Sequence, residues 1–146
     1  MKPTFVRILF MLVLGLAALT LAAAQGSQTM VQTLTAQQRP IVNVSNYPFG
    51  LTKPARLEQI SQAIVRAGAR RGWSIVQVRP GVLVGTLNIR THQAAVDIVH
   101  DTSTFSITYK SSSNLLYDAD RQVIHRNFNI WIQNLRGDIM SEAAII

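Results

Sequence analysis

The chain has 146 residues, enough for one domain, and its 14 Lys and Arg against 7 Asp and Glu give a formal net charge of +7. It contains no Cys, which excludes a thiol nucleophile, a Cys-based zinc or iron–sulfur site and a lipid carried on an N-terminal cysteine. The charge favours anionic partners, although an excess of this size is also ordinary for a protein surface.

Residues 1–24 have the organisation of a cleavable signal peptide. Lys2 and Arg7 form a positive start, the next 17 residues carry no charge, and Ala22 and Ala24 fit the small-residue cleavage rule. The alternative is a retained anchor, for which this run is short against about 30 Å of hydrocarbon. We therefore expect an exported protein, periplasmic or secreted, with no stable membrane span after cleavage and a net charge of +5 on the remaining chain.

The segment that follows is expected to be flexible. Residues 25–40 are rich in Gln, Thr and Ser and show no apolar period, so we expect a tether ahead of a single α+β domain at 41–146. A short strand is predicted at 41–44. Asn46 and the turn-forming residues 48–50 are expected to stop it.

A helix is predicted from Lys53 to Arg71. Thr52 can cap its start, Pro54 suits its first turn, and Gly72 favours a left-handed end. The apolar residues follow helical spacing and form one stripe: Leu57, Ile60, Ile64 and Ala67.

Four strands are predicted after this helix, because the apolar period changes to two. They cover residues 73–79, 82–90, 94–100 and 104–110. The last alternates most cleanly, with Phe105, Ile107 and Tyr109 on one face and Ser106, Thr108 and Lys110 on the other. Connections this short require antiparallel neighbours, and the apolar face of such a sheet needs a cover.

A loop is predicted at 111–118 and a second helix at 120–144, where large apolar residues again follow helical spacing. The two helices are the available cover for the sheet. The sequence therefore predicts a two-layer α+β sandwich, in which a four-stranded antiparallel sheet, with a fifth strand possible at 41–44, packs against two helices.

Several short motifs between residues 60 and 139 carry a resemblance. They are Ala67-Gly68 through Gly72-Trp73, Pro80-Gly81, Arg90-Thr91-His92, Ser106-Ile107-Thr108-Tyr109, Ser112-Ser113-Asn114-Leu115, Ile124-His125-Arg126-Asn127-Phe128-Asn129 and Trp131-Ile132-Gln133-Asn134-Leu135. Together they resemble a family of small, uncharacterised exported proteins and lipoproteins of Gram-negative bacteria. Many members carry a lipid on a cysteine, and this chain has none. The resemblance implies compartment and architecture, and it implies no activity.

Catalytic and metal motifs are weak. A serine hydrolase would draw on Ser112, Asp118 and His125, but the G-x-S-x-G pattern is missing. A metal site would draw on the residues His92, Asp97, His100 and Asp101, whose spacing matches no common ligand pattern. We expect no catalytic, cofactor or metal site, and no nucleic-acid partner, because export and the lack of a stacking motif argue against one.

The densest mixture of aromatic, amide and hydroxyl side chains lies between residues 109 and 131. Its candidate binding residues are Tyr109, Ser112, Asn114, Tyr117, His125 and Asn129, with Trp131 expected in the core. One interpretation is a binding groove. The other is structural, with Asn and Ser satisfying loop backbone and His125 capping a turn. We expect a non-catalytic module that binds an envelope protein or an anionic envelope ligand. The alternative is a small periplasmic hydrolase with its site near 109–125.

The signal-peptide prediction is tested by the mass of the protein isolated from cells. Cleavage after Ala24 should leave Gln25, or a residue within a few positions of it, as the N-terminus. A full-length species held stably in the inner membrane would contradict the prediction.

Overall fold

A computed structural model describes residues 26–146, so the predicted signal peptide and its cleavage site lie outside the described residues. The chain divides into two compact units after Gln37. In the first, residues 26–37 form a helix, and the second begins with a strand at 38–40. The flexible tether expected at 25–40 thus has helical backbone over residues 26–37, and the second unit begins at Gln38, three residues before the predicted start of the domain.

The second unit contains seven strands and two helices. In chain order they are β1 Gln38–Pro40, β2 Val44–Pro48, α2 Leu57–Arg70, β3 Trp73–Arg79, β4 Val82–Ile89, β5 His92–His100, β6 Thr104–Ser113, β7 Val123–His125 and α3 Arg126–Ala143. Five strands form one antiparallel sheet in the order β2-β6-β5-β4-β3, while β1 and β7 form a separate antiparallel pair.

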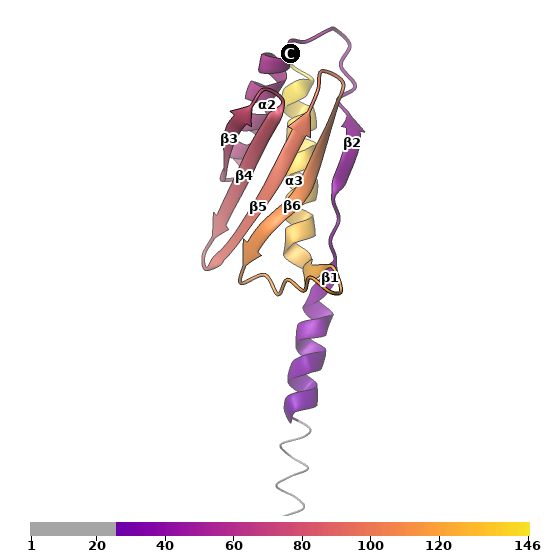
Figure 1. Ribbon diagram of the computed structural model, residues 1–146, viewed down its shortest axis with the longest axis vertical. Helices are drawn as coiled ribbons and strands as arrows, with labels where there is room; N and C mark the ends of the chain where they lie inside the picture. Colours follow the sequence, from indigo (N-terminus) through magenta and orange to yellow (C-terminus); the bar gives the residue numbers. More distant parts are fainter. Residues whose placement is uncertain (1–25) are drawn as a thin grey trace, which may run out of the picture. The chain divides into compact units, whose positions relative to one another are not determined.

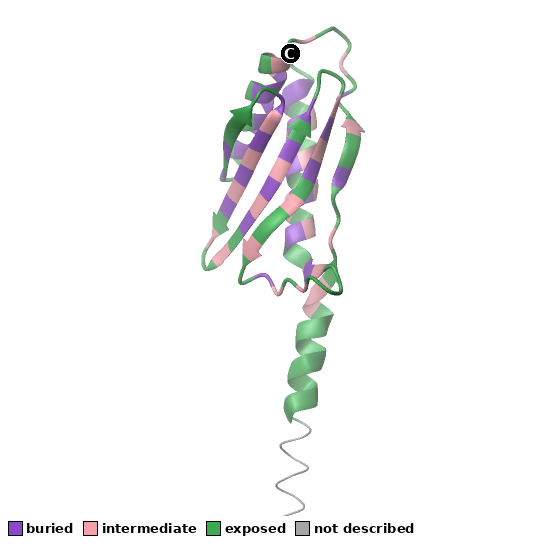
Figure 2. Ribbon diagram, viewed as in Figure 1, coloured by how far each residue is buried: buried purple, intermediate pink, exposed green. Residues whose placement is uncertain are grey.

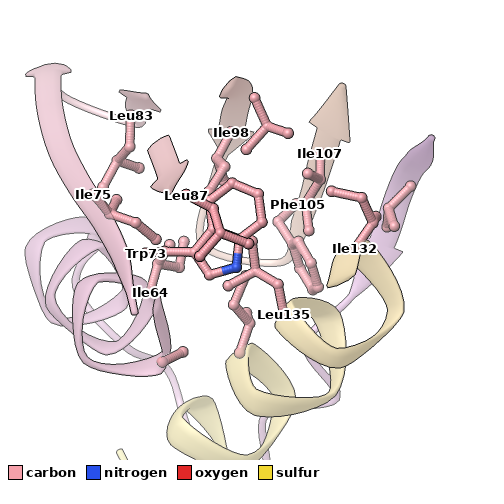
Figure 3. Packing of buried hydrophobic residues seen from close by; sticks show 14 of the residues in the cluster. Ile64, Trp73, Ile75, Leu83, Leu87, Ile98, Phe105, Ile107, Ile132 and Leu135 are labelled. Atoms are coloured by element: carbon pink, nitrogen blue, oxygen red, sulfur yellow. The ribbon is translucent and has the colours of Figure 1, made fainter. Parts of the chain in front are cut away.

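One face of the five-stranded sheet is packed under α2 and α3 (Figure 1). Alternate residues of the central strands are buried, and they appear as stripes in Figure 2. Trp73 lies between the sheet and the helices, close to Leu87, Ile64 and Leu135 in the view of Figure 3. The period-two pattern of the sequence therefore identifies the covered face correctly.

The helix α2 starts later than predicted, at Leu57 instead of Lys53. Pro54 disfavours helical backbone at the residue before it. The start is then fixed by Gln59, whose side-chain Oε1 accepts from the backbone N–H of Arg56 at 3.0 Å. At the other end Gly72 adopts φ +79°, as its predicted left-handed role requires.

Gly68 lets α2 approach the sheet closely. A Cβ built at Gly68 would lie 2.3 Å from Cδ1 of Ile75 on β3, so any larger residue would force the Ile75 side chain to move.

The two helices are joined by ion pairs at their exposed rim. The carboxylate of Glu142 on α3 is only 3% exposed and accepts from Arg66 Nε at 2.8 Å and Arg70 Nη2 at 2.6 Å, both on α2. Arg71, just beyond α2, pairs with Asp138 at 2.6 Å. Because both oxygens of Glu142 are charge-paired, its burial is compensated and the helices are held in one layer.

Two predictions of strand position are wrong. The extra strand of the large sheet is β2 at 44–48, which contains the residues expected to stop it; Asn46 takes a positive φ, and its backbone N–H donates to Ser106 Oγ at 2.9 Å. Residues 123–125 form β7 instead of the first turn of a helix, because the distant strand β1 supplies their partners. The last helix therefore starts at Arg126.

The fold is thus α+β: the four predicted strands are joined by the fifth that the sequence left possible, and β1 and β7 form a small two-stranded sheet. Among residues 26–146, no helix has the length and apolarity needed to cross a bilayer.

The register of β6 gives a test of the buried face. Ile107 is 1% exposed, whereas its neighbour Thr108 is exposed on the opposite face. We expect Ile107→Ala to lower the free energy of unfolding by about 2–4 kcal/mol. Thr108→Ala is the matched control and should change it by less than about 0.5 kcal/mol. Chemical denaturation measures both, and equal losses would show that the register is wrong.

Candidate functional site

The strained backbone of the domain gathers at one end of the sheet, where the loop 114–122 passes the β4–β5 turn. Five described non-glycine residues have positive φ, and four of them lie in this region. They are Arg90, Asn114, Leu116 and Gln122. A bulky residue such as Leu116 rarely adopts φ near +51°, so the surrounding bonds must hold it there. Because strained backbone is common at functional sites, we take this loop as the candidate site.

A bulge in β6 places two of the predicted residues on one face. Val96 pairs with Tyr109 and Ala95 with Ser111, so Lys110 is an extra residue in the ladder. In a regular strand Tyr109 and Ser112 would face opposite sides, but here their hydroxyl groups lie 3.0 Å apart.

Tyr117 extends this cluster to the surface. Its ring centroid lies 4.6 Å from that of Tyr109, which in turn meets the buried ring of Phe128 edge-on at 5.6 Å. Tyr117 remains 39% exposed. The three rings form a series from the core to solvent, and the outermost ring is held in place from beneath.

Asn114 joins the loop to the β4–β5 turn. Its side-chain Nδ2 donates to the carbonyl of Thr91 at 2.7 Å, and its own carbonyl lies 2.6 Å from Nδ1 of His92. A carbonyl only accepts, so His92 carries its proton on Nδ1. Asn114 is therefore a structural residue of the loop, which favours the structural interpretation of this position.

His125 caps α3. Its Nδ1 accepts from the backbone N–H of Asn127 at 3.2 Å, and its backbone N–H donates to the carbonyl of Leu115 at 2.8 Å. Burial lowers the pKa of His125 below its ordinary value of 6.5, and the charges of Arg126 and His92 lower it further. The neutral imidazole is the form that can accept the capping bond.

The strand β1 braces the same loop from outside the large sheet. Gln38 Nε2 donates to the carbonyl of Leu116 at 2.6 Å, and its Oε1 accepts from Arg121, which also pairs with Asp118 at 2.8 Å. Leu116 is thus held in its unusual conformation by a residue 78 positions away.

Asn129 lies apart from these contacts. Its Oδ1 accepts from the N–H of Val42 at 3.1 Å and its Nδ2 donates to the carbonyl of Pro40 at 2.8 Å, which fastens the β1–β2 connection to α3. Trp131, expected in the core, is only partly buried, and its neighbour Ile132 is the buried residue at 1% exposure. Of the six predicted residues, the structure therefore brings Tyr109, Ser112 and Tyr117 together.

The residues considered for hydrolysis have separate partners. Ser112 bonds to Tyr109, Asp118 pairs with Arg121, and the Nδ1 of His125 is engaged by Asn127.

The residues considered for a metal are also divided, because His92 and His100 begin and end the nine-residue strand β5. Within residues 26–146, no group of three or more His, Cys, Asp or Glu is placed to hold a metal ion.

Sequence reasoning missed a buried Ser–His pair. Ser61 Oγ on α2 lies 2.9 Å from Nε2 of His100 on β5, and Nδ1 of His100 lies 2.9 Å from the carbonyl of Asp101. This is hydrogen-bonding geometry that a nucleophile and its base also use. However, Ser61 is only 1% exposed, so a substrate has no access to it. The pair satisfies two buried polar groups and joins α2 to the sheet. Ser61 follows Ile60, a residue of the predicted apolar stripe. This position beside the stripe is the sequence feature that could have indicated that Ser61 is buried.

Two hollows of the domain lie at the other end of β5. One, of about 520 Å³, lies between the 50–55 segment and Thr102–Ser103, and the other, of about 300 Å³, lies between residues 50–53 and 143–146. The predicted binding groove at 109–131 coincides with neither of them and stays a prediction.

Comparison of the chain with protein-family models, curated proteins and solved structures found no match. The resemblance to small exported proteins therefore stays a prediction, and the site must be interpreted from its own geometry.

The cap formed by His125 predicts a pH dependence of stability. Because the pKa of His125 is lower in the folded protein, the unfolded chain binds more protons, and this contribution to stability is complete above pH 6.5 and declines as the pH falls below it. We expect His125→Asn, which keeps a capping acceptor but does not titrate, to remove that part of the decline. Denaturant unfolding between pH 5 and pH 8 measures the difference, and identical pH profiles for the two proteins would contradict it.

Proposed function

We propose that the chain is an exported, non-catalytic binding module that recognises its partner with the 114–122 loop. The observation that carries the proposal is the exposed ring of Tyr117, supported by Tyr109 on a loop whose strained backbone is held by bonds from two other segments. A protein that maintains such strain commonly uses it to present a side chain in a fixed geometry. A rigid exposed tyrosine is a frequent anchor in binding surfaces.

The charge around the loop supports an anionic partner. Arg126 is exposed at the start of α3 and lowers the pKa of His125 beside it. The acidic Asp118 is already paired with Arg121. Asp120 is the other acid of the loop, so Arg126 is the cation that an acidic group on an envelope protein, or an anionic envelope ligand, would meet beside the loop.

The sequence pattern of residues 1–24 supports export. A positive start, an uncharged run and small residues at Ala22 and Ala24 are typical of a secretory signal. Exported proteins of this kind would meet their partners in the periplasm or outside the cell.

Site-specific crosslinking in growing cells tests the binding surface. A photoreactive residue replaces Ala119, which is exposed in the loop, and in a separate protein it replaces Glu58, which is exposed on α2. We expect a discrete adduct from position 119 and none from position 58. Adding Tyr117→Ala should reduce the 119 adduct about tenfold, a loss of the size expected for a binding hot spot.

The stability of each variant separates binding from folding. Tyr117→Ala removes a partly exposed ring and should leave the melting temperature within a few degrees of the parent. Asn114→Ala removes the bond to Thr91 and places a less suitable residue at φ +55°, so it should lower the melting temperature. Equal adducts from positions 119 and 58, or an adduct unaffected by Tyr117→Ala, would contradict the proposed function.

A further inference from the structure

We propose that β3 is a docking edge for an extended peptide segment that adds a sixth strand to the sheet and carries acidic residues at its ends. This surface is separate from the 114–122 loop, and the proposal goes beyond the function argued above. It rests on three features of β3 and its neighbours, which are the free edge, the exposed valines and the sign of the surrounding charge.

The first feature is an unpaired strand edge. Within the described part of the chain, β3 is hydrogen-bonded to β4 alone and stands at the end of the strand order. In an antiparallel sheet, alternate residues of an edge strand direct their N–H and C=O groups outward, where an extended chain can bond to them. From Trp73 to Gln77 the pairing with β4 is regular, so the outer side of this stretch is suited to a ladder.

The second feature is the apolar surface beside that edge. Val76 and Val78 are 61% and 64% exposed, and every residue from 76 to 79 at the end of β3 is exposed (Figure 2). Val76 pairs with Val84 on β4, and Val82 pairs with Val99 on β5, which is itself 50% exposed. By this register Val76, Val82, Val84 and Val99 lie on the face of the sheet away from the helices. Val78 is exposed beside them, at the irregularity between Gln77 and Arg79. An added strand would cover the outer margin of these valines with alternate side chains.

The opposite edge of the sheet lacks these properties. The strand β2 has an irregular register between Val44 and Tyr47, a positive φ at Asn46, and Pro48, which has no N–H to donate. Such features prevent further strands from adding. The ladder of β3 is also interrupted, between Gln77 and Arg79, but its stretch from Trp73 to Gln77 is regular and borders the exposed Val76.

The third feature decides the chemistry of the occupant. Neither β3 nor β4 contains an acidic residue, and Asp97 on β5 is neutralised by Lys110 at 2.6 Å. Arg79 is exposed at the end of β3, and Arg90 is exposed in the β4–β5 turn, one residue beyond β4 and at the opposite end of the β3–β4 pair. Neither has an ion pair within residues 26–146. A second copy of this basic chain would bring further positive charge to the edge. An apolar strand with an acidic residue at each end would complement it.

Two peptide probes test the proposal on the protein as isolated from cells. Both have the core Thr-Val-Thr-Val-Thr; one carries Glu at each end and the other carries Lys. Nuclear magnetic resonance measures amide shifts and hydrogen exchange during titration. We expect the Glu-ended peptide to slow exchange on β3 and to bind about fivefold tighter than the Lys-ended peptide, the contribution of about one exposed ion pair.

Three variants test separately how the strand edge and its charge contribute to peptide binding. Val76→Lys should weaken binding of the Glu-ended peptide about tenfold, while the control Thr108→Lys, on the same face but on β6, should leave it unchanged. Arg79→Glu should reverse the preference and favour the Lys-ended peptide. Because these side chains are exposed, all three variants should keep the parent melting temperature.

The proposal fails if neither peptide slows exchange on β3 at millimolar concentration, or if both bind equally and Arg79→Glu changes nothing. A dimer of the free protein that dissociates on Val76→Lys, seen by sedimentation, would instead assign the edge to a second copy. Shifts confined to the 114–122 loop would assign peptide binding to the site of the proposed function and would also overturn the role of β3.

Discussion

The burial of one sheet face under α2 and α3 is the constraint on which the other features of this domain depend. The inward residues of the central strands pack against Ile60, Ile64 and Leu135 of the two helices, and the largest of them are fully buried. The Glu142 carboxylate on α3 pairs with Arg66 and Arg70 of α2 and so links the two helices. The core thereby fixes the helices on one side and leaves the other face, the edges and the end loops uncovered by them.

The strands that pair with close sequence neighbours could be predicted from the sequence, and those that pair with distant segments could not. The strands β3 to β6 were recognised because each pairs with its neighbour through a short turn, and the alternation of Phe105, Ile107 and Tyr109 shows which face is covered. The strands β1, β2 and β7 were misplaced because their partners lie far along the chain. No local pattern shows that Val123–His125 will pair with residues 38–40. The helical spacing therefore led to a predicted helix that begins too early, at residue 120.

The candidate site was predictable in composition and not in geometry. The region 109–131 was correctly identified as rich in polar and aromatic groups, but the bulge at Lys110 decides that Tyr109 and Ser112 meet, and the sequence carries no clear signal for it. Asn129 bonds to the β1–β2 connection, which no spacing within its own helix could indicate. Residues that share a sequence neighbourhood were thus divided by contacts with distant segments.

The pairing of β1 with β7 has a mechanical consequence. It spans only three residues, Gln38–Pro40 against Val123–His125, and Gln38 also holds the carbonyl of Leu116. A pull on the chain ahead of Gln38 reaches this short ladder before it reaches the five-stranded sheet. The pair would peel open one residue at a time, since each rung bears the load in turn, and Leu116 would lose its brace at the first step. We therefore expect the loop to lose its brace from Gln38 before the pairing of the five-stranded sheet is disturbed.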